Sequence, residues 1–104
     1  MISYSVYISD AAYKDIYQIV SYITDELLEP QIANNLLDVL LNAISSLSEI
    51  PHRHMLVDRV KVCDYPIRTF TVESYIIFYI INENEKSVDI ARVLYKRRDW
   101  TYLL

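Results

Sequence analysis

The chain contains no glycine, and this absence limits both its turns and its chemistry. A glycine-rich phosphate-binding loop, as used by many nucleotide-binding proteins, is excluded. Backbone positions that need a positive φ must therefore fall to Asn, Asp or Ser. The two sharpest turns that we expect, one at Glu73 and Ser74 and one at residues 82–86, both offer residues of these types.

Disulfides, metal motifs and long apolar runs are missing as well. Cys63 is the only cysteine, which excludes an internal disulfide and suits a reducing compartment. His52 and His54 lack further ligands at metal-site spacing, so we expect surface loop residues and no metal or cofactor. The apolar run at residues 76–81 is too short to span a membrane, and residues 1–8 lack the features of a signal peptide. The sequence predicts a cytoplasmic protein with no membrane partner.

Basic residues are scarce in the first half of the chain. The 104 residues include 10 Lys and Arg against 14 Asp and Glu, which gives a net charge of −4. Lys14 alone among the basic residues precedes residue 51. The length suits a single domain over residues 1–104. Because every arginine lies in the second half, we expect the guanidinium groups to share one part of the fold.

Hydrophobic periodicity predicts a strand and then two helices in the first half. Residues 2–8 alternate between apolar and polar side chains, as a strand does. Apolar side chains then recur at helical spacing over residues 10–27 and 30–50, and Ser9 or Asp10 can cap the first helix. Two amphipathic helices joined by a short break form a helical hairpin that buries one apolar stripe.

Three strands are predicted in the second half, over residues 67–72, 75–81 and 88–94. The middle strand is apolar on both faces, as expected if it meets helices on one side and a small second core or a partner on the other. Residues 51–64 lack a clear period and predict an irregular connection that could end in a strand. Residues 97–104 predict a short C-terminal helix or turn. The order β-α-α-β-β-β predicts an α+β fold, with the helical hairpin packed on a mostly antiparallel sheet.

Arg92 interrupts an apolar row in the last predicted strand. Alternation places it on the same face as Ile90 and Leu94, so its guanidinium must pair with a carboxylate, reach an edge or meet an anionic partner. Three carboxylates are the candidates for such a pair: Glu73, Asp64 and Asp99. Asp15, like the other acids of the helices, is expected to lie on a solvated helix face.

A run of cations flanked by aromatic rings follows this strand: Tyr95, Lys96, Arg97, Arg98 and Trp100. Cations beside rings suit phosphate contacts combined with base stacking, although the run could equally be a solvated turn. Arg68, in the strand over residues 67–72, could share a sheet face with Arg92 if the two strands were adjacent. Otherwise Arg68 is an exposed residue of the sheet.

The C-terminal strands resemble those of the RelE/ParE superfamily, the toxins of bacterial type II toxin–antitoxin pairs. Residues 90–99 carry the most specific likeness, to the last strand and tail of these toxins. Residues 68–72 and 75–79 resemble the middle strands, and residues 9–23 and 33–51 resemble the two helices. The resemblance implies a helical hairpin over an antiparallel sheet, and inhibition by a cognate antitoxin whose C-terminal segment wraps the toxin.

The superfamily divides by target, and one position favours the ParE-like branch. RelE-like members cleave mRNA on the ribosome and carry an arginine where this chain has Ile76. An alkyl group cannot stabilise the charge that develops on a scissile phosphate. ParE-like members have an apolar residue there and poison DNA gyrase without an active site of their own. The resemblance implies such a non-enzymatic toxin, with a binding surface formed by Arg68, Arg92, Lys96, Arg97, Arg98 and Trp100.

Two alternatives remain open. In one the chain is a ribosome-dependent mRNA endoribonuclease, and its partners are the ribosome and mRNA. The resemblance then implies these candidate catalytic residues: Arg68, Arg92, Tyr95 and Arg97. In the other, the domain has lost toxicity and retains only antitoxin binding.

Overall fold

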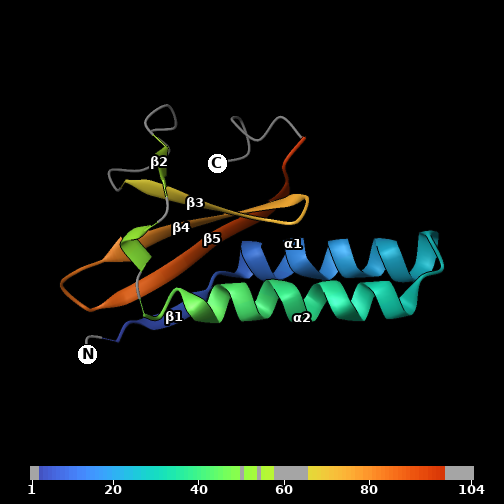
Figure 1. The fold of residues 1–104 in the computed structure, drawn as a ribbon, viewed down its shortest axis with the longest axis horizontal. Coiled ribbons are helices and arrows are strands. Elements are labelled where there is room, and N and C mark those ends of the chain that lie inside the picture. Colours follow the sequence, from blue (N-terminus) through green and yellow to red (C-terminus); the bar gives the residue numbers. More distant parts are fainter. Residues whose placement is uncertain (1–2, 50, 54, 58–65, 98–104) are drawn as a thin grey trace.

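The computed structural model describes residues 3–49, 51–53, 55–57 and 66–97 (Figure 1). Its elements are β1 (Ser5–Ile8), α1 (Asp10–Ser21), the π-helix η1 (Tyr22–Glu26), α2 (Pro30–Ser46), the 3-10 helix η2 (Pro51–Arg53), β2 (Met55–Val57), β3 (Ile67–Val72), β4 (Tyr75–Asn82) and β5 (Ser87–Tyr95). The predicted α+β order is confirmed, and β2 is added within the expected irregular connection. Most of the predicted C-terminal helix or turn lies outside the described residues.

The strands form one sheet in the order β1-β5-β4-β3-β2. β1 pairs with β5 in parallel, and the other pairs are antiparallel. The sheet is therefore mostly antiparallel, as predicted, with β4 at its centre. In Figure 1, α1 and α2 lie side by side along the sheet, and the end of the hairpin that carries η1 extends beyond the strands. No helix in the described part of the chain is long and apolar enough to cross a membrane.

Ser9 links the start of α1 to the sheet. Its hydroxyl accepts a hydrogen bond from the Ala12 amide at 3.0 Å, so Ser9 rather than Asp10 caps the helix. The same hydroxyl donates to the Ala91 carbonyl at 2.8 Å, and the Ser9 amide donates to the Ile90 carbonyl at 3.0 Å. The helix therefore begins directly beside β5, where strand β1 ends.

The main core lies between the hairpin and the sheet. Leu40 and Leu47 pack from the helical side against Ile77 and Tyr79 of β4, and all four side chains are fully buried. The Tyr79 hydroxyl donates to the carbonyl of Pro51, so the buried phenol has a hydrogen-bond partner in η2, which follows α2. A smaller core on the other face of the sheet contains Ile67, Phe78 and Leu94. The prediction of a central strand that is buried on both faces is thus confirmed.

A β-bulge in β5 changes which side chains share a face. Ile90 pairs with Tyr79, whereas Arg92 pairs with Phe78, so the strand holds one extra residue at this point. Directly paired residues point to the same face of a sheet. Ile90 accordingly belongs to the main core and Leu94 to the smaller one. The predicted row that placed Arg92 with both of them is wrong, because simple alternation does not survive a bulge.

Among the described residues, three that are not glycine have positive φ angles: Leu28 at 55°, Glu73 at 56° and Lys86 at 51°. Two of them lie in the turns that the sequence predicted, but the expectation that Asn, Asp or Ser would supply these positions is wrong. The geometry of the turn, rather than the residue type, decides which position takes the positive φ. Between the paired residues Val72 and Tyr75, the first of the two turn residues takes the positive φ, as in a type II′ turn. Each such residue costs about 1–2 kcal/mol relative to glycine.

Candidate functional site

Arg92 forms a two-pronged ion pair with Asp15 of α1. The distance from Nε of Arg92 to Oδ2 of Asp15 is 2.7 Å, and Nη2 lies 2.8 Å from Oδ1. The amide of Val93 also donates to Oδ2 at 3.0 Å. Asp15 is only 7% exposed. The hydrogen bonds from the Arg92 side chain to Asp15 raise the pKa of Arg92. The guanidinium is therefore held against the helix and its charge is balanced.

This pair corrects two predictions about Arg92 and Asp15. Arg92 pairs with Asp15, which was not among the predicted partners, and Asp15 does not lie on a solvated helix face. Two of the predicted partners, Asp64 and Asp99, lie outside the described residues. The topology gives the reason. β1 pairs with β5 only as far as Ile90, so beyond that residue the edge of β5 is met by α1 instead of a strand. Asp15 binds the Val93 amide at that edge, where a neighbouring strand would otherwise accept it.

Arg68 lies apart from Arg92. It pairs with Tyr79, whereas Arg92 pairs with Phe78, the neighbouring residue of the same strand. Consecutive residues of a strand point to opposite faces, and β4 separates the strands of the two arginines. Nη1 of Arg68 donates to the His52 carbonyl at 3.0 Å. The two arginines therefore do not share one face of the sheet.

The predicted cationic run is described only in part. Tyr95 ends β5 and is 41% exposed, and the side chains of Lys96 and Arg97 are exposed in the turn that follows. The Lys96 amide donates to the Ser74 carbonyl at 2.9 Å, which ties this turn to the hairpin between β3 and β4. Arg98 and Trp100 lie outside the described residues.

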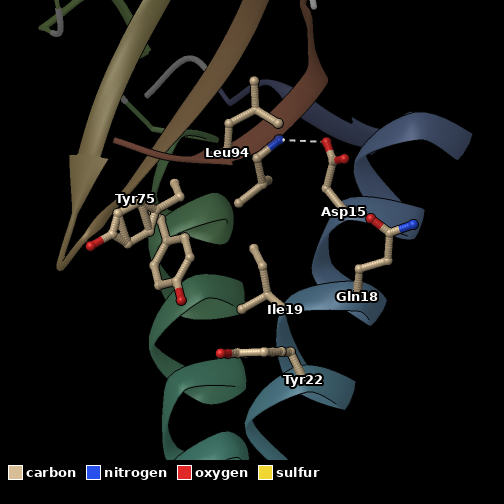
Figure 2. A pocket seen from close by; sticks show the side chains of 8 residues that line it. Asp15, Gln18, Ile19, Tyr22, Tyr75 and Leu94 are labelled. Carbon is tan, nitrogen blue, oxygen red and sulfur yellow. Dashed lines mark hydrogen bonds between the residues drawn. The ribbon is translucent and has the colours of Figure 1, made fainter. Parts of the chain in front are cut away.

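Two hollows flank a pair of tyrosines at this end of the sheet. The pair is Tyr75 and Tyr95, and both rings border a hollow of about 350 Å³ (Figure 2). The lining of this hollow also includes Asp15, Gln18, Ile19, Tyr22 and Leu94. A second hollow of about 370 Å³ is lined by residues of α2 and of the β3–β4 turn, again with Tyr75 and Tyr95. We call the two hollows together the tyrosine groove.

The tyrosines of this groove pack edge to face, with ring centroids 5.8 Å apart. Tyr75 and Tyr95 are directly paired residues of β4 and β5. Burial, and secondarily the neighbouring Tyr95, raise the pKa of Tyr75. Sequence reasoning did not find this groove, although the abundance of tyrosine, with 10 in the chain, pointed to half-buried surfaces and interfaces.

The groove continues toward an apolar surface at the free end of the hairpin. Four large side chains there are more than half exposed: Tyr22, Leu27, Leu28 and Ile32. Contiguous exposed apolar side chains on a small protein mark sites of interaction. The surrounding acids are Asp25, Glu26 and Glu29, and the hairpin carries only Lys14 as a basic residue. A partner that covers this end would match it best with apolar anchors flanked by basic side chains.

A cluster of polar side chains lies near the start of β5, at the opposite end of the strand from Tyr95. We call it the Glu83 cluster, and it consists of Tyr4, His52, Glu83 and Lys86. Oε2 of Glu83 accepts hydrogen bonds from the Tyr4 hydroxyl and from Nζ of Lys86, both at 3.0 Å. Oε1 contacts Nε2 of His52. Hydrogen bonds from Lys86, then from His52 and Tyr4, lower the pKa of Glu83 from 4.5 to about 2.

Removing this carboxylate is expected to change the acid limb of the stability curve. The folded pKa of Glu83 is lowered, so its contribution is present above about pH 4.5 and disappears as the pH falls toward 2. Denaturant unfolding followed between pH 6 and pH 2 should show a shallower loss of stability for Glu83→Gln than for the wild type. Glu85→Gln, in the same turn, should follow the wild-type curve. Parallel curves for all three proteins would contradict the assignment.

No group of three or more His, Cys, Asp or Glu within the described ranges is placed to hold a metal ion.

Comparison with known proteins identifies the family. Residues 6–100 match the model of the family described as the ParE toxin of the type II toxin–antitoxin system parDE. A search of curated proteins gave no match.

Solved structures show the same fold. A chain of the chromosomal ParDE system from P. aeruginosa aligns with a TM-score of 0.71 and 16% identity, over 91% of this chain and 98% of the other. A chain of the RelBE2 toxin–antitoxin complex from Mycobacterium tuberculosis gives 0.60 and 20%, over 90% and 99%. A chain of the RelE–RelB complex from Pyrococcus horikoshii OT3 gives 0.61 and 14%, over 92% and 98%. With the family model covering nearly its whole length, the chain belongs to the ParE toxins of type II toxin–antitoxin systems.

Proposed function

We propose that this chain inhibits growth by binding and poisoning DNA gyrase in the cytoplasm, and that a cognate antitoxin neutralises it. The family match over residues 6–100 supports a ParE-like toxin that acts as a single domain. On this proposal the protein is an inhibitor that binds its target and carries out no reaction of its own.

The observation that carries this proposal is the placement of the arginines. Cations gathered around one phosphate stabilise the negative charge that develops during cleavage of a phosphodiester. Arg92 is instead paired with Asp15, and Arg68 lies on the other face of the sheet. Ile76, at the position where RNA-cleaving relatives have an arginine, pairs with Leu94 and packs beside the smaller core. The described residues thus favour a binding surface over a hydrolytic site.

The antitoxin is proposed to cover the tyrosine groove and the exposed cations beside it. Tyr75 and Tyr95 offer large, partly exposed rings between two hollows, which is the kind of surface that anchors a partner. Lys96 and Arg97 are exposed next to these rings and suit acidic side chains of the antitoxin. A helical antitoxin segment could place apolar side chains in the hollows while its acids meet these cations.

Expression of the toxin without its antitoxin tests the target. We expect growth arrest with SOS induction and gyrase–DNA breaks that can be trapped and mapped. Coexpression of a candidate antitoxin from the neighbouring reading frame should suppress both effects. Transcript-end mapping on the same cultures covers the alternative, since codon-positioned mRNA cuts without DNA breaks would identify a ribosome-dependent endoribonuclease. In that case Arg97→Ala should abolish cutting while the fold survives.

A further inference from the structure

The Glu83 cluster gathers hydrogen-bond donors from three separate parts of the chain. Tyr4 precedes β1, His52 belongs to η2 and Lys86 ends the turn between β4 and β5. Their donors all point at the two oxygens of one carboxylate. About half of the Glu83 side chain remains exposed, so solvent reaches the point where these donors converge.

These donors are held in place by contacts that do not involve Glu83. The Tyr4 amide donates to the Ser48 carbonyl at 2.7 Å, and the carbonyl of Lys86 accepts from the Ser5 amide at 2.9 Å. The ring of Tyr4 also contacts both other donors. Its centroid lies 5.8 Å from that of the His52 ring, and Nζ of Lys86 lies 5.5 Å from it. The donor geometry should therefore persist if the carboxylate moves away.

Glu83 itself is well placed to move. It follows the last residue of β4 in an exposed turn, and the contacts described above reach it through its side chain. The turn ends at Lys86, whose positive φ of 51° is unusual for a residue with a side chain. Strained backbone of this kind concentrates at ligand-binding sites and switch regions.

A hollow of about 230 Å³ opens beside the carboxylate and is lined by His52, Pro66, Arg68, Ile81 and Glu83. It is smaller than the range of about 300–1,000 Å³ that holds whole small-molecule ligands. Arg68 adds a guanidinium at the wall of this hollow, and the His52 imidazole also lines it. The ammonium group of Lys86 lies at the same carboxylate. A small oxyanion therefore fits this place better than a nucleotide or an apolar molecule.

We infer that the Glu83 cluster is a phosphate-binding cradle in which Glu83 occupies the anion position until a phosphate group displaces it. The tyrosine hydroxyl, the imidazole and the ammonium group would donate to the phosphate oxygens, and Arg68 would approach from the hollow. The cradle lies at the opposite end of β5 from Tyr95, so this inference is independent of the proposed antitoxin surface and of the cellular target.

Titration of inorganic phosphate into the full 104-residue chain, followed by amide NMR shifts, tests this inference. Glu83→Gln removes the internal competitor and should bind phosphate at least about tenfold more tightly than the wild type, since one charge-assisted contact is worth at least that factor. The largest shifts should fall on Tyr4, His52 and Lys86. Glu85→Gln removes the same charge from the same turn without touching the cradle, and its affinity should stay within about twofold of the wild type.

Further outcomes decide between a cradle and a general charge effect. Adding Lys86→Gln to Glu83→Gln should return the affinity to the wild-type level or below. Equal tightening in Glu83→Gln and Glu85→Gln, or no saturable shift in Glu83→Gln, would overturn the inference. A short single-stranded oligonucleotide in the same assay separates the sources. Shifts at the same amides at lower concentration indicate a backbone phosphate, whereas shifts with inorganic phosphate alone indicate the free anion.

Discussion

Replacement of Asp15 by Ala is expected to destabilise the protein by about 3–5 kcal/mol, because it breaks a buried ion pair from one side. The change leaves the Arg92 guanidinium without its carboxylate and the Val93 amide without its acceptor. The Arg92 side chain is 24% exposed, so water relieves part of the loss and the lower end of the range is expected. Urea unfolding of the two proteins at neutral pH measures the difference.

Matched variants separate the ion pair from the loss of an acid on a helix. Asp38→Ala removes an exposed carboxylate from the middle of α2 and should change stability by no more than about 0.5 kcal/mol. The double variant Asp15→Leu with Arg92→Met removes both charges and should recover much of the stability, since paired apolar replacements of buried ion pairs are often tolerated. A loss below about 1 kcal/mol for Asp15→Ala would show that the pair contributes little.

Replacement of Tyr95 by Ala is expected to weaken antitoxin binding by about 30-fold, the effect of losing one aromatic anchor at an interface. Tyr95 borders both hollows of the tyrosine groove and packs against Tyr75, so its removal takes contacts from both. Titration calorimetry with a candidate antitoxin from the neighbouring reading frame measures the change.

Tyr7→Ala serves as the control for this experiment. Tyr7 is 59% exposed on β1 and pairs with Asp89, six residues before Tyr95 on β5. Its replacement should leave the antitoxin affinity within a few-fold of the wild type. If Tyr95→Ala and Tyr7→Ala have the same effect, the groove is not the anchoring surface. If Tyr95→Ala instead abolishes mRNA cutting and leaves antitoxin binding intact, the endoribonuclease alternative gains its support.

Much of the fold could be predicted because its elements follow simple periodicity. Residues 75–81 are apolar on both faces of a strand, which is why β4 could be predicted as a central strand from its sequence. In the structure β4 lies at the centre of the sheet, and its consecutive residues Ile77 and Phe78 are both fully buried. The apolar stripes of the two helices likewise predicted a hairpin that faces one core. The resemblance in the C-terminal strands then predicted the family that the match over residues 6–100 shows.

What could not be predicted depends on contacts between distant residues. The bulge at Ala91 changes the face of the residues after it, and nothing in the local pattern marks it. The pairing of Asp15 with Arg92 joins residues 77 positions apart, and it requires knowledge of where β1 stops. The tyrosine groove likewise combines both helices with the ends of β4 and β5. Spacing along the chain carries no direct sign of any of these.

The parallel pairing of the first strand with the last has a consequence for how the toxin is made. Val6 meets Val88 and Ile8 meets Ile90, and the contacts of Ser9 and Asp15 with β5 also span most of the sequence. None of them can form until β5 has left the ribosome tunnel. Since long-range pairing of this kind also folds slowly, the sheet is completed late, and the tyrosine groove that includes Tyr95 forms only at that stage.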